Sequence, residues 1–311
     1  MNEQQQEYDR FGPWAVEISA EDPPPPLFVP YLTRSEPALL CVKIPRPIAR
    51  RDAHPGMDLY DYLVCLYADD MTILQRQRQG VRTVTFRYRE VQRLRVDAHL
   101  LRGNLHLGLP GRPYDLPYNT VGQDLMLRIV ELVRQRYVGP HSGPVLLPDT
   151  TPTVREGELS FLFERLLAEE QRSTGMRLLA AQGTTAVTSD GLGTARRLLF
   201  RIADKRLLES MHLTDGRELK VVGRGYTYAY RWQAIYGTDT TFLPIDNLTG
   251  VAWEDDAPDA ATNLVLRTSG GSSVHAFTRD NPSIDADTVF LSSLPHLAPQ
   301  AADAAARSHP A

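Results

Sequence analysis

Two runs of alternating apolar and polar residues, over 84–89 and 93–100, are the feature that most limits how this chain can fold. Successive side chains of a strand point to opposite faces, so a period of two predicts strands with one buried and one solvated face. The first half of the chain is therefore expected to be built from half-buried strands. The apolar members of the pattern are Val84, Phe86, Tyr88, Leu94, Val96, Ala98 and Leu100.

A hairpin and a helix are expected to follow this pattern. Gly103-Asn104 is a favourable turn between a strand over 93–101 and the next strand. Asn119 or Thr120 can cap a helix that ends before Gly139-Pro140. The apolar stripe of this helix consists of Val121, Leu125, Ile129, Leu132 and Val133.

The second half is expected to repeat the same plan of strands closed by a helix. A connecting helix is predicted from Thr153, because its spacing to Glu156 fits a capping box. Asn281 caps the final helix and Pro282 starts it. The strands between these helices are expected over 198–202, 207–213, 218–236 with a turn or bulge near Gly223–Gly225, and 248–253, followed by a hairpin over 264–278.

Two short segments indicate an internal duplication. Each contains three apolar residues at the same spacing, preceded by an aromatic and an acidic residue, and each leads into a strand, a hairpin and a helix. The first segment contains Phe86, Glu90, Val91, Leu94 and Val96, and the second contains Phe242, Asp246, Leu248, Val251 and Trp253.

Stretches rich in proline and glycine divide the chain. Pro23–Pro26 follows a polar N-terminus and favours an extended conformation. The run from Gly139 to Pro144 predicts a linker. The expected organisation is a flexible arm over 1–30, a first domain over 31–139, a linker and connecting helix over 140–174, a second domain over 175–297 and a disordered tail over 298–311.

Curved antiparallel strands closed by one C-terminal helix resemble the bacterial pleckstrin-homology-like (PH-like) fold. The resemblance rests on Phe86–Val91, Leu100–Leu105 and Leu116–Asn119, and it covers 31–139 and, more weakly, 175–297. It implies a mainly β (α+β) fold of two tandem PH-like antiparallel barrels or sandwiches, each closed by a C-terminal helix. In that family the open end of the barrel usually binds a lipid headgroup, a peptide or a protein, and enzymes are uncommon.

Charge and composition narrow the function classes. The formal net charge is −4, whereas dedicated nucleic-acid or anionic-membrane binders are usually basic. The N-terminus MNEQQQEYDR lacks the apolar core of a secretory signal, and no stretch approaches the ~18 apolar residues of a membrane helix. We therefore expect a cytoplasmic protein, with a peripheral position at the membrane as an alternative. Cys41 and Cys65 are expected to be buried free thiols.

The sharpest charge feature is a run of seven arginines between Arg76 and Arg95, with Glu90 as its only acidic residue. Guanidinium groups suit phosphate and carboxylate, so these arginines predict a patch for an anionic ligand. The alternative is a solvated sheet face paired with acidic residues. With a second group on an early loop, the candidate anion-binding residues are Arg46, Arg50, Arg51, Arg87, Arg89, Arg93 and Arg95.

Four aromatic residues at a period of two would share one face of one strand: Tyr226, Tyr228, Tyr230 and Trp232. Burial in the core is the favoured interpretation, because a fully exposed aromatic strip would promote association. The alternative is a stacking platform for bases or sugars, with Arg224 and Arg231 holding phosphate.

Catalytic and metal-binding signals are largely missing from the sequence. It contains no G-x-S-x-G, no phosphate loop with G-K-[ST] and no H-E-x-x-H. His99 and His106 would face each other across the hairpin with a turn at Arg102-Gly103 but not with one at Gly103-Asn104; a metal ion needs more ligands in either case, so a surface pair is expected. A Ser–His–Asp set could still be assembled from distant positions. We expect no catalytic residues, no metal ion and no cofactor.

These observations favour a non-enzymatic binding or scaffold protein that recognises a protein partner or an anionic ligand through PH-like domains. The first alternative is binding to anionic lipid at a membrane surface through the arginine patches. The second is single-stranded nucleic-acid binding on the strip from Tyr226 to Trp232, although nucleic acid is the less favoured partner. The oligomeric state stays open.

Overall fold

The computed structural model describes residues 3–138, 147–148, 151–155, 157–187, 204–230, 232–256, 261–294 and 297. These residues form antiparallel sheets with few helices, which confirms the predicted mainly β class. Among the described residues, no sheet pairs its first strand with its last, so no sheet is a closed barrel.

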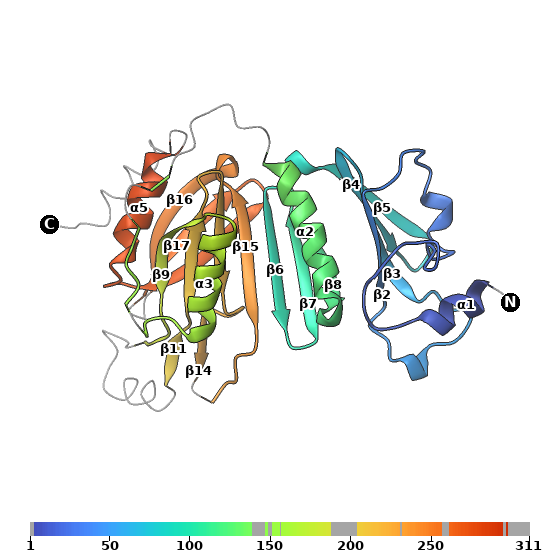
Figure 1. The fold of residues 1–311 in the computed structure, drawn as a ribbon, viewed down its shortest axis with the longest axis horizontal. Helices are drawn as coiled ribbons and strands as arrows, with labels where there is room; N and C mark the ends of the chain where they lie inside the picture. The colour runs from blue at the N-terminus through green and yellow to red at the C-terminus, as the bar shows by residue number, and fades with distance from the viewer. Residues whose placement is uncertain are drawn as a thin grey trace. The chain divides into compact units, whose positions relative to one another are not determined.

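The chain divides into two compact units, whose elements are labelled in Figure 1. The first unit contains residues 1–91, 100–105 and 115–139, and the second contains 92–99, 106–114 and 140–311. Two segments that lie within 31–139 in the sequence therefore belong to the second unit.

The first unit contains a five-stranded sheet in the order β1-β2-β3-β4-β5. Its strands pair in sequence, as expected for a meander of neighbouring antiparallel strands. Leu63, Val64 and Ile73 are fully buried in its centre. The strands are β1 (Val16–Glu17), β2 (Leu40–Pro45), β3 (Tyr60–Leu66), β4 (Asp70–Arg76) and β5 (Val81–Arg87).

Cys41 and Cys65 lie directly opposite each other on β2 and β3 and form a disulfide. The expectation of two free thiols was therefore wrong. A separation of 24 residues along the chain does not indicate pairing, whereas the strand register brings the two Cα atoms to 4.2 Å.

The N-terminal segment packs onto the first unit rather than forming the expected flexible arm. Its helix α1 (Glu3–Arg10) is followed by Phe11, and Phe11 and Phe28 are both buried in the same apolar cluster as Leu63. Arg50 donates hydrogen bonds to the carbonyl oxygens of Asp9 and Phe11. The proline run therefore lies between two anchored aromatic side chains.

Glu7 on α1 should make the stability of this unit depend on pH. Burial, together with Asp58, raises the pKa of Glu7 from 4.5 to about 7, although Lys43 opposes the shift. Because the pKa is higher in the folded state, the stabilising contribution is complete below pH 4.5 and is lost as the pH rises through about 7. We expect Glu7→Gln to reduce the fall in melting temperature between pH 5 and pH 8. Asp9→Asn, at an exposed position of the same helix, should leave that fall unchanged.

Three strands and a helix follow β5: β6 (Arg93–His99), β7 (Arg102–Gly108), β8 (Tyr114–Asn119) and α2 (Gln123–Tyr137). The Asn119 side chain accepts a hydrogen bond from the amide of Val121 at 3.0 Å, in agreement with the predicted cap. Met126, Ile129 and Val133 are buried along one side of α2.

The turn predicted at Gly103-Asn104 was wrong. The chain turns at Leu100-Leu101, and Leu100 takes a positive φ of 52°. Gly103 lies inside β7, where a Cβ atom would be 2.3 Å from the Tyr118 ring. The glycine is needed for the close approach of that ring and does not form the turn.

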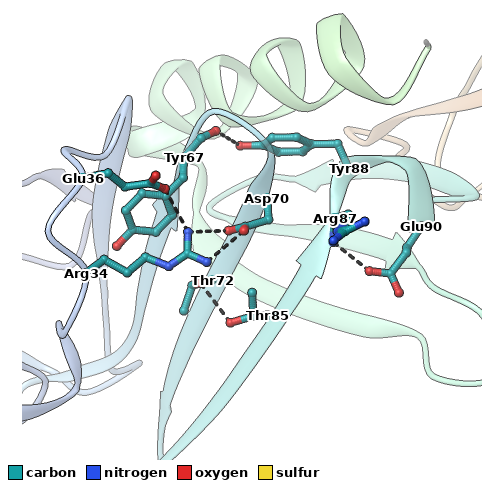
Figure 2. A network of polar contacts seen from close by, with 9 residues as sticks. All are labelled: Arg34, Glu36, Tyr67, Asp70, Thr72, Thr85, Arg87, Tyr88 and Glu90. Atoms are coloured by element: carbon teal, nitrogen blue, oxygen red, sulfur yellow. Dashed lines mark hydrogen bonds and ion pairs between the residues drawn. The ribbon is translucent and has the colours of Figure 1, made fainter.

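A polar network surrounds the exit from β5 (Figure 2). The Arg34 guanidinium donates to Asp70 at 2.8 Å and lies over the Tyr67 ring, 4.3 Å from its centroid. Tyr88 Oη donates to the Tyr67 carbonyl oxygen at 2.6 Å. The Glu90 carboxylate accepts a hydrogen bond from the Arg87 amide and caps the 3₁₀ turn over Tyr88–Glu90. This turn contains Arg89 and lies between Arg87, at the end of β5, and β6.

The second unit contains antiparallel neighbours in the order β6-β15-β13-β12-β9. A second sheet has the order β16-β17-β18, and a third has the order β10-β11-β14. The remaining bounds are β9 (Arg177–Gln182), β10 (Thr185–Ala186), β11 (Lys205–Leu207), β12 (Ser210–Thr214), β13 (Glu218–Gly223), β14 (Tyr228–Tyr230), β15 (Thr238–Pro244), β16 (Leu248–Asp256), β17 (Ala261–Thr268) and β18 (Gly271–Thr278).

The larger sheet of the second unit is buried on both faces. Helix α3 (Phe161–Ser173) places Phe163 against Leu178 and Met211 on one face. Helix α5 (Ser283–Ser293) and the β16–β18 sheet cover Leu179 and other residues on the opposite face. Figure 1 shows α3 in yellow-green and α5 in red within this unit.

Several expectations for the second half differ from the structure. Helix α3 begins at Phe161 rather than at Thr153. The segment expected over 218–236 turns near Gly225, which takes a φ of +77°, as predicted, but it forms two separate strands, β13 and β14, and β14 ends at Tyr230. The strand expected over 198–202 and the tail over 298–311 lie outside the described residues. The final hairpin and the helix after Asn281 are present as predicted.

Candidate anion-binding site

Arg93 and Arg95 come together in a cavity of about 250 Å³ within the second unit. Both project from β6, where their spacing of two residues places them on one face of the strand, as the sequence predicts. The cavity is also lined by residues from β13, β15, β18 and the loops around Ser210 and Tyr226. Its charged lining consists of Arg93, Arg95, Arg224, Glu209 and Asp239.

The arginines of β6 are held in place by neighbouring groups. The Arg93 side chain donates to the carbonyl oxygen of Ser272. Arg95 Nε lies 3.4 Å from Asp239 Oδ2, and its side chain remains 38% exposed. That separation is longer than a strong charge-assisted hydrogen bond, so the pair leaves Arg95 open to an additional anionic partner.

Two glycines allow Asp239 to lie beside Arg95. The Gly225 amide donates to Asp239 Oδ1 at 2.7 Å. A Cβ atom at Gly223 would be 2.8 Å from that same oxygen. Gly223-Arg224-Gly225 therefore shapes the wall of the cavity by close approach and by a turn.

Arg224 and Glu209 form a buried ion pair in the wall of the cavity. Glu209 accepts hydrogen bonds from Arg224 Nε at 2.7 Å and from the Ser160 amide at 2.8 Å. The Arg224 guanidinium also lies over the Phe163 ring, 5.0 Å from its centroid. Because each charge has a close partner, this pair anchors the start of α3 to the cavity wall.

Ser273 and His275 extend the site along β18. Ser273 Oγ and His275 Nε2 are 2.7 Å apart, and both residues line the cavity. Burial lowers the pKa of His275 well below 6.5, and the positive charges of Arg95 and Arg93 and the nearby His212 lower it further. His275 is therefore neutral near pH 7, in a region of positive potential.

A buried His–Asp pair lies directly behind His275. The rings of His212 and His275 meet edge to face with centroids 5.0 Å apart. His212 Nδ1 is 2.9 Å from Asp287 Oδ2, and both side chains have no exposed surface. This pair joins β12 to α5 through a polar contact within the core.

The Ser273–His275 pair has the spacing of a nucleophile and its base, but its electrostatics suit a different role. A general base must accept a proton and become cationic in the transition state. Burial opposes that charge most, and His212, Arg95 and Arg93 add to this effect, so the pKa of His275 is lowered well below 6.5. The same positive potential stabilises a bound anion, so the arrangement favours anion binding over proton abstraction.

The other predicted arginines lie in the first unit. Arg46 donates to the Asp58 carbonyl oxygen at 3.0 Å, and Arg50 anchors the N-terminal segment. Arg51 is 87% exposed and lies 3.8 Å from Asp52. The remaining two, Arg87 and Arg89, are also exposed. The structure therefore does not place all seven predicted arginines in one cavity.

The aromatic strip is not buried, so the interpretation as core was wrong. Tyr226, Tyr230 and Trp232 are exposed, Trp232 to 70%. The Tyr230 and Trp232 rings stack with centroids 5.0 Å apart, and Lys205 lies over Tyr228. β14 is a three-residue strand at the edge of its sheet, so it cannot bury a long row of side chains. Tyr226 lines the cavity, which connects the strip to the site.

The remaining sequence candidates show no metal site. His106 Nε2 lies 2.5 Å from Asp97 Oδ1, and His99 meets the Tyr226 ring edge to face. Among the described residues, no three His, Cys, Asp or Glu side chains are grouped to hold a metal ion. Within the same residues, no helix has the length and apolar character needed to cross a membrane.

Sequence reasoning found Arg93 and Arg95 but missed the groups around them. His212, His275 and Asp287 lie on β12, β18 and α5, far apart in the chain. For these groups the sequence offered one signal: Ser273 and His275 are two residues apart on a predicted strand and therefore share a face. No protein-family model matches the chain, and no curated protein matches it significantly.

Proposed function

We propose that the protein is a non-enzymatic binding protein of two PH-like repeats, in which the Arg93–Arg95 cavity holds an anionic group of the ligand. The single observation that carries the binding proposal is the convergence of these two arginines with His275 on one concave site. Guanidinium groups recognise carboxylate and phosphate oxygens, and a concave site excludes competing water better than an open surface.

The order of elements supports the PH-like part of the proposal. β2–β5 are followed by a 3₁₀ turn, then by β6–β8 and α2. β9, β12, β13 and β15 are followed by a 3₁₀ turn over Ile245–Asn247, then by β16–β18 and α5. In each series four strands precede the 3₁₀ turn, and three strands and a helix follow it. This repeated order also supports the internal duplication.

Binding is tested by titrating the protein with sodium sulfate in a calorimeter at low ionic strength. We expect saturable binding that Arg95→Ala weakens by about tenfold or more, because a hydrogen bond to a charged group contributes about 1.5–3 kcal/mol. Asp239→Asn should strengthen sulfate binding, since it removes a negative charge 3.4 Å from Arg95 but keeps an acceptor for Gly225.

Arg89→Ala is the matched control, because it removes an exposed arginine of the predicted patch from the other unit. It should leave sulfate affinity unchanged. Equal weakening by Arg89→Ala and Arg95→Ala would indicate non-specific charge attraction. That result, or a lack of saturable binding, would refute the cavity as an anion site.

A further inference from the structure

The Arg93–Arg95 cavity contains a second set of groups that can contact a bound anion. Ser273 Oγ and His275 Nε2 line the cavity from β18, while the two arginines line it from β6. An anion between these strands would therefore meet two fixed positive charges, a hydroxyl and an imidazole that is neutral while the cavity is empty.

Charged and titratable groups surround His275 from several elements. β6 contributes Arg93 and Arg95, and β12 contributes His212, which is hydrogen-bonded to Asp287 of α5. Other groups lining the cavity are Asp239 on β15, beside Arg95, and the mutually paired Glu209 and Arg224. Burial, and to a smaller extent His212, Arg95 and Arg93, lower the pKa of His275 and keep it unprotonated. A bound anion would offset those positive charges and favour protonation.

The contact between Ser273 and His275 links protonation of the imidazole to the ligand, while the added proton stays on His275. A protonated His275 carries hydrogen on both ring nitrogens, so Nε2 donates to Ser273 Oγ at the observed 2.7 Å. Ser273 Oγ then accepts from His275, and its own hydrogen is free to donate to an oxygen of the ligand. In the neutral tautomer whose Nε2 accepts from Ser273 Oγ, protonation of His275 reverses this hydrogen bond and leaves the serine hydrogen for the anion.

We propose that the cavity binds a tetrahedral dianion, such as the phosphate of a monoester, and that binding is coupled to uptake of one proton by His275. This inference rests on the proposed anion-binding function. A dianion offsets the charge of both arginines, whereas a carboxylate offsets only one of them. Three groups of donors, from Arg93, Arg95 and Ser273, match the three terminal oxygens of a phosphate monoester.

Sulfate is a suitable probe because it remains a dianion across the pH range of interest, so any pH dependence of its binding comes from the protein. Calorimetric titration at pH 7 in two buffers with different ionisation enthalpies should show uptake of close to one proton per sulfate bound. Sulfate affinity should fall by up to about tenfold per pH unit between the pKa of His275 in the free protein and its higher pKa in the complex, and should level off above the latter. Acetate should bind more weakly and take up less than one proton.

Two histidine variants separate the proposed group from its neighbours. His275→Gln should retain Arg95-dependent sulfate binding but lose the proton uptake and the pH dependence. His99→Gln, which removes a histidine in contact with Tyr226 at the cavity, should keep both. The proton count for the unaltered protein does not depend on whether either variant folds.

The outcomes distinguish this inference from the function on which it rests. Arg95-dependent sulfate binding without proton uptake would overturn the coupling and leave the anion site intact. A lack of sulfate binding would overturn both. Glycerol phosphate and vesicles containing phosphatidic acid show whether the bound phosphate belongs to a small molecule or to a lipid. Binding of both supports an accessible phosphate monoester. Binding of neither contradicts the proposed ligand class. Binding of the vesicles alone would assign a lipid headgroup.

Discussion

Replacement of Asp287 by alanine is expected to lower the free energy of unfolding by about 3 kcal/mol or more. The variant removes the hydrogen-bond partner of His212 Nδ1 at a site where both side chains are fully buried. The histidine nitrogen loses its partner inside the core, so the folded state bears the cost of an unsatisfied polar group. Denaturant unfolding followed by circular dichroism measures the difference.

Asp285→Ala provides the control for this measurement. Asp285 lies on the same helix, α5, and is exposed, so its replacement should change stability by less than about 0.5 kcal/mol. An Asp287→Ala variant as stable as Asp285→Ala would show that the buried pair is not an important link between β12 and α5.

Replacement of Phe28 by alanine should destabilise the first unit by about 3–5 kcal/mol. The Phe28 ring has no exposed surface and belongs to the cluster that contains Phe11, Tyr60 and Leu63. Removal of the ring leaves a cavity that these neighbours cannot fill without moving. Thermal unfolding followed by circular dichroism would detect the loss.

Val29→Ala is the matched control, because Val29 follows Phe28 directly and is 52% exposed. It should change stability by less than about 0.5 kcal/mol. If both variants were as stable as the unaltered protein, the N-terminal segment would behave as the flexible arm that the proline run suggested.

Local patterns predicted those parts of the fold that depend on neighbouring residues in the chain. The Asn119 cap and the apolar stripe predicted the helix α2, because a helix is determined largely by residues within a few turns, although Val121 of that stripe lies before the helix and is exposed. Gly103 shows the limit of this reasoning. Its sequence context suggested a turn, but its role is to make room for Tyr118, which lies on another strand.

The same limit applies to the aromatic strip. Period-two aromatics occur both in buried strands and on exposed ones, and only the tertiary structure shows which applies. Here β14 ends at Tyr230 and has one neighbouring strand, so Tyr230 and Trp232 remain exposed. Their proposed stacking role stays a prediction.

Part of the candidate site could also be predicted from sequence. Arg93 and Arg95 share a face because they are two residues apart on one strand, and this required no knowledge of the fold. The contact between His212 and His275 depends on how two separate sheets pack together, and no local pattern encodes that arrangement.

The pairing of β6 with β15 has a consequence for how the protein is made. Ala98 lies opposite Thr238, so β6 leaves the ribosome well before its partner has been translated. Contacts between residues far apart in sequence form slowly, because the intervening chain must lose entropy before they contribute stability. The second unit therefore cannot complete its larger sheet until synthesis has passed Phe242, and a fragment that begins after α2 would expose β15 as an unprotected edge.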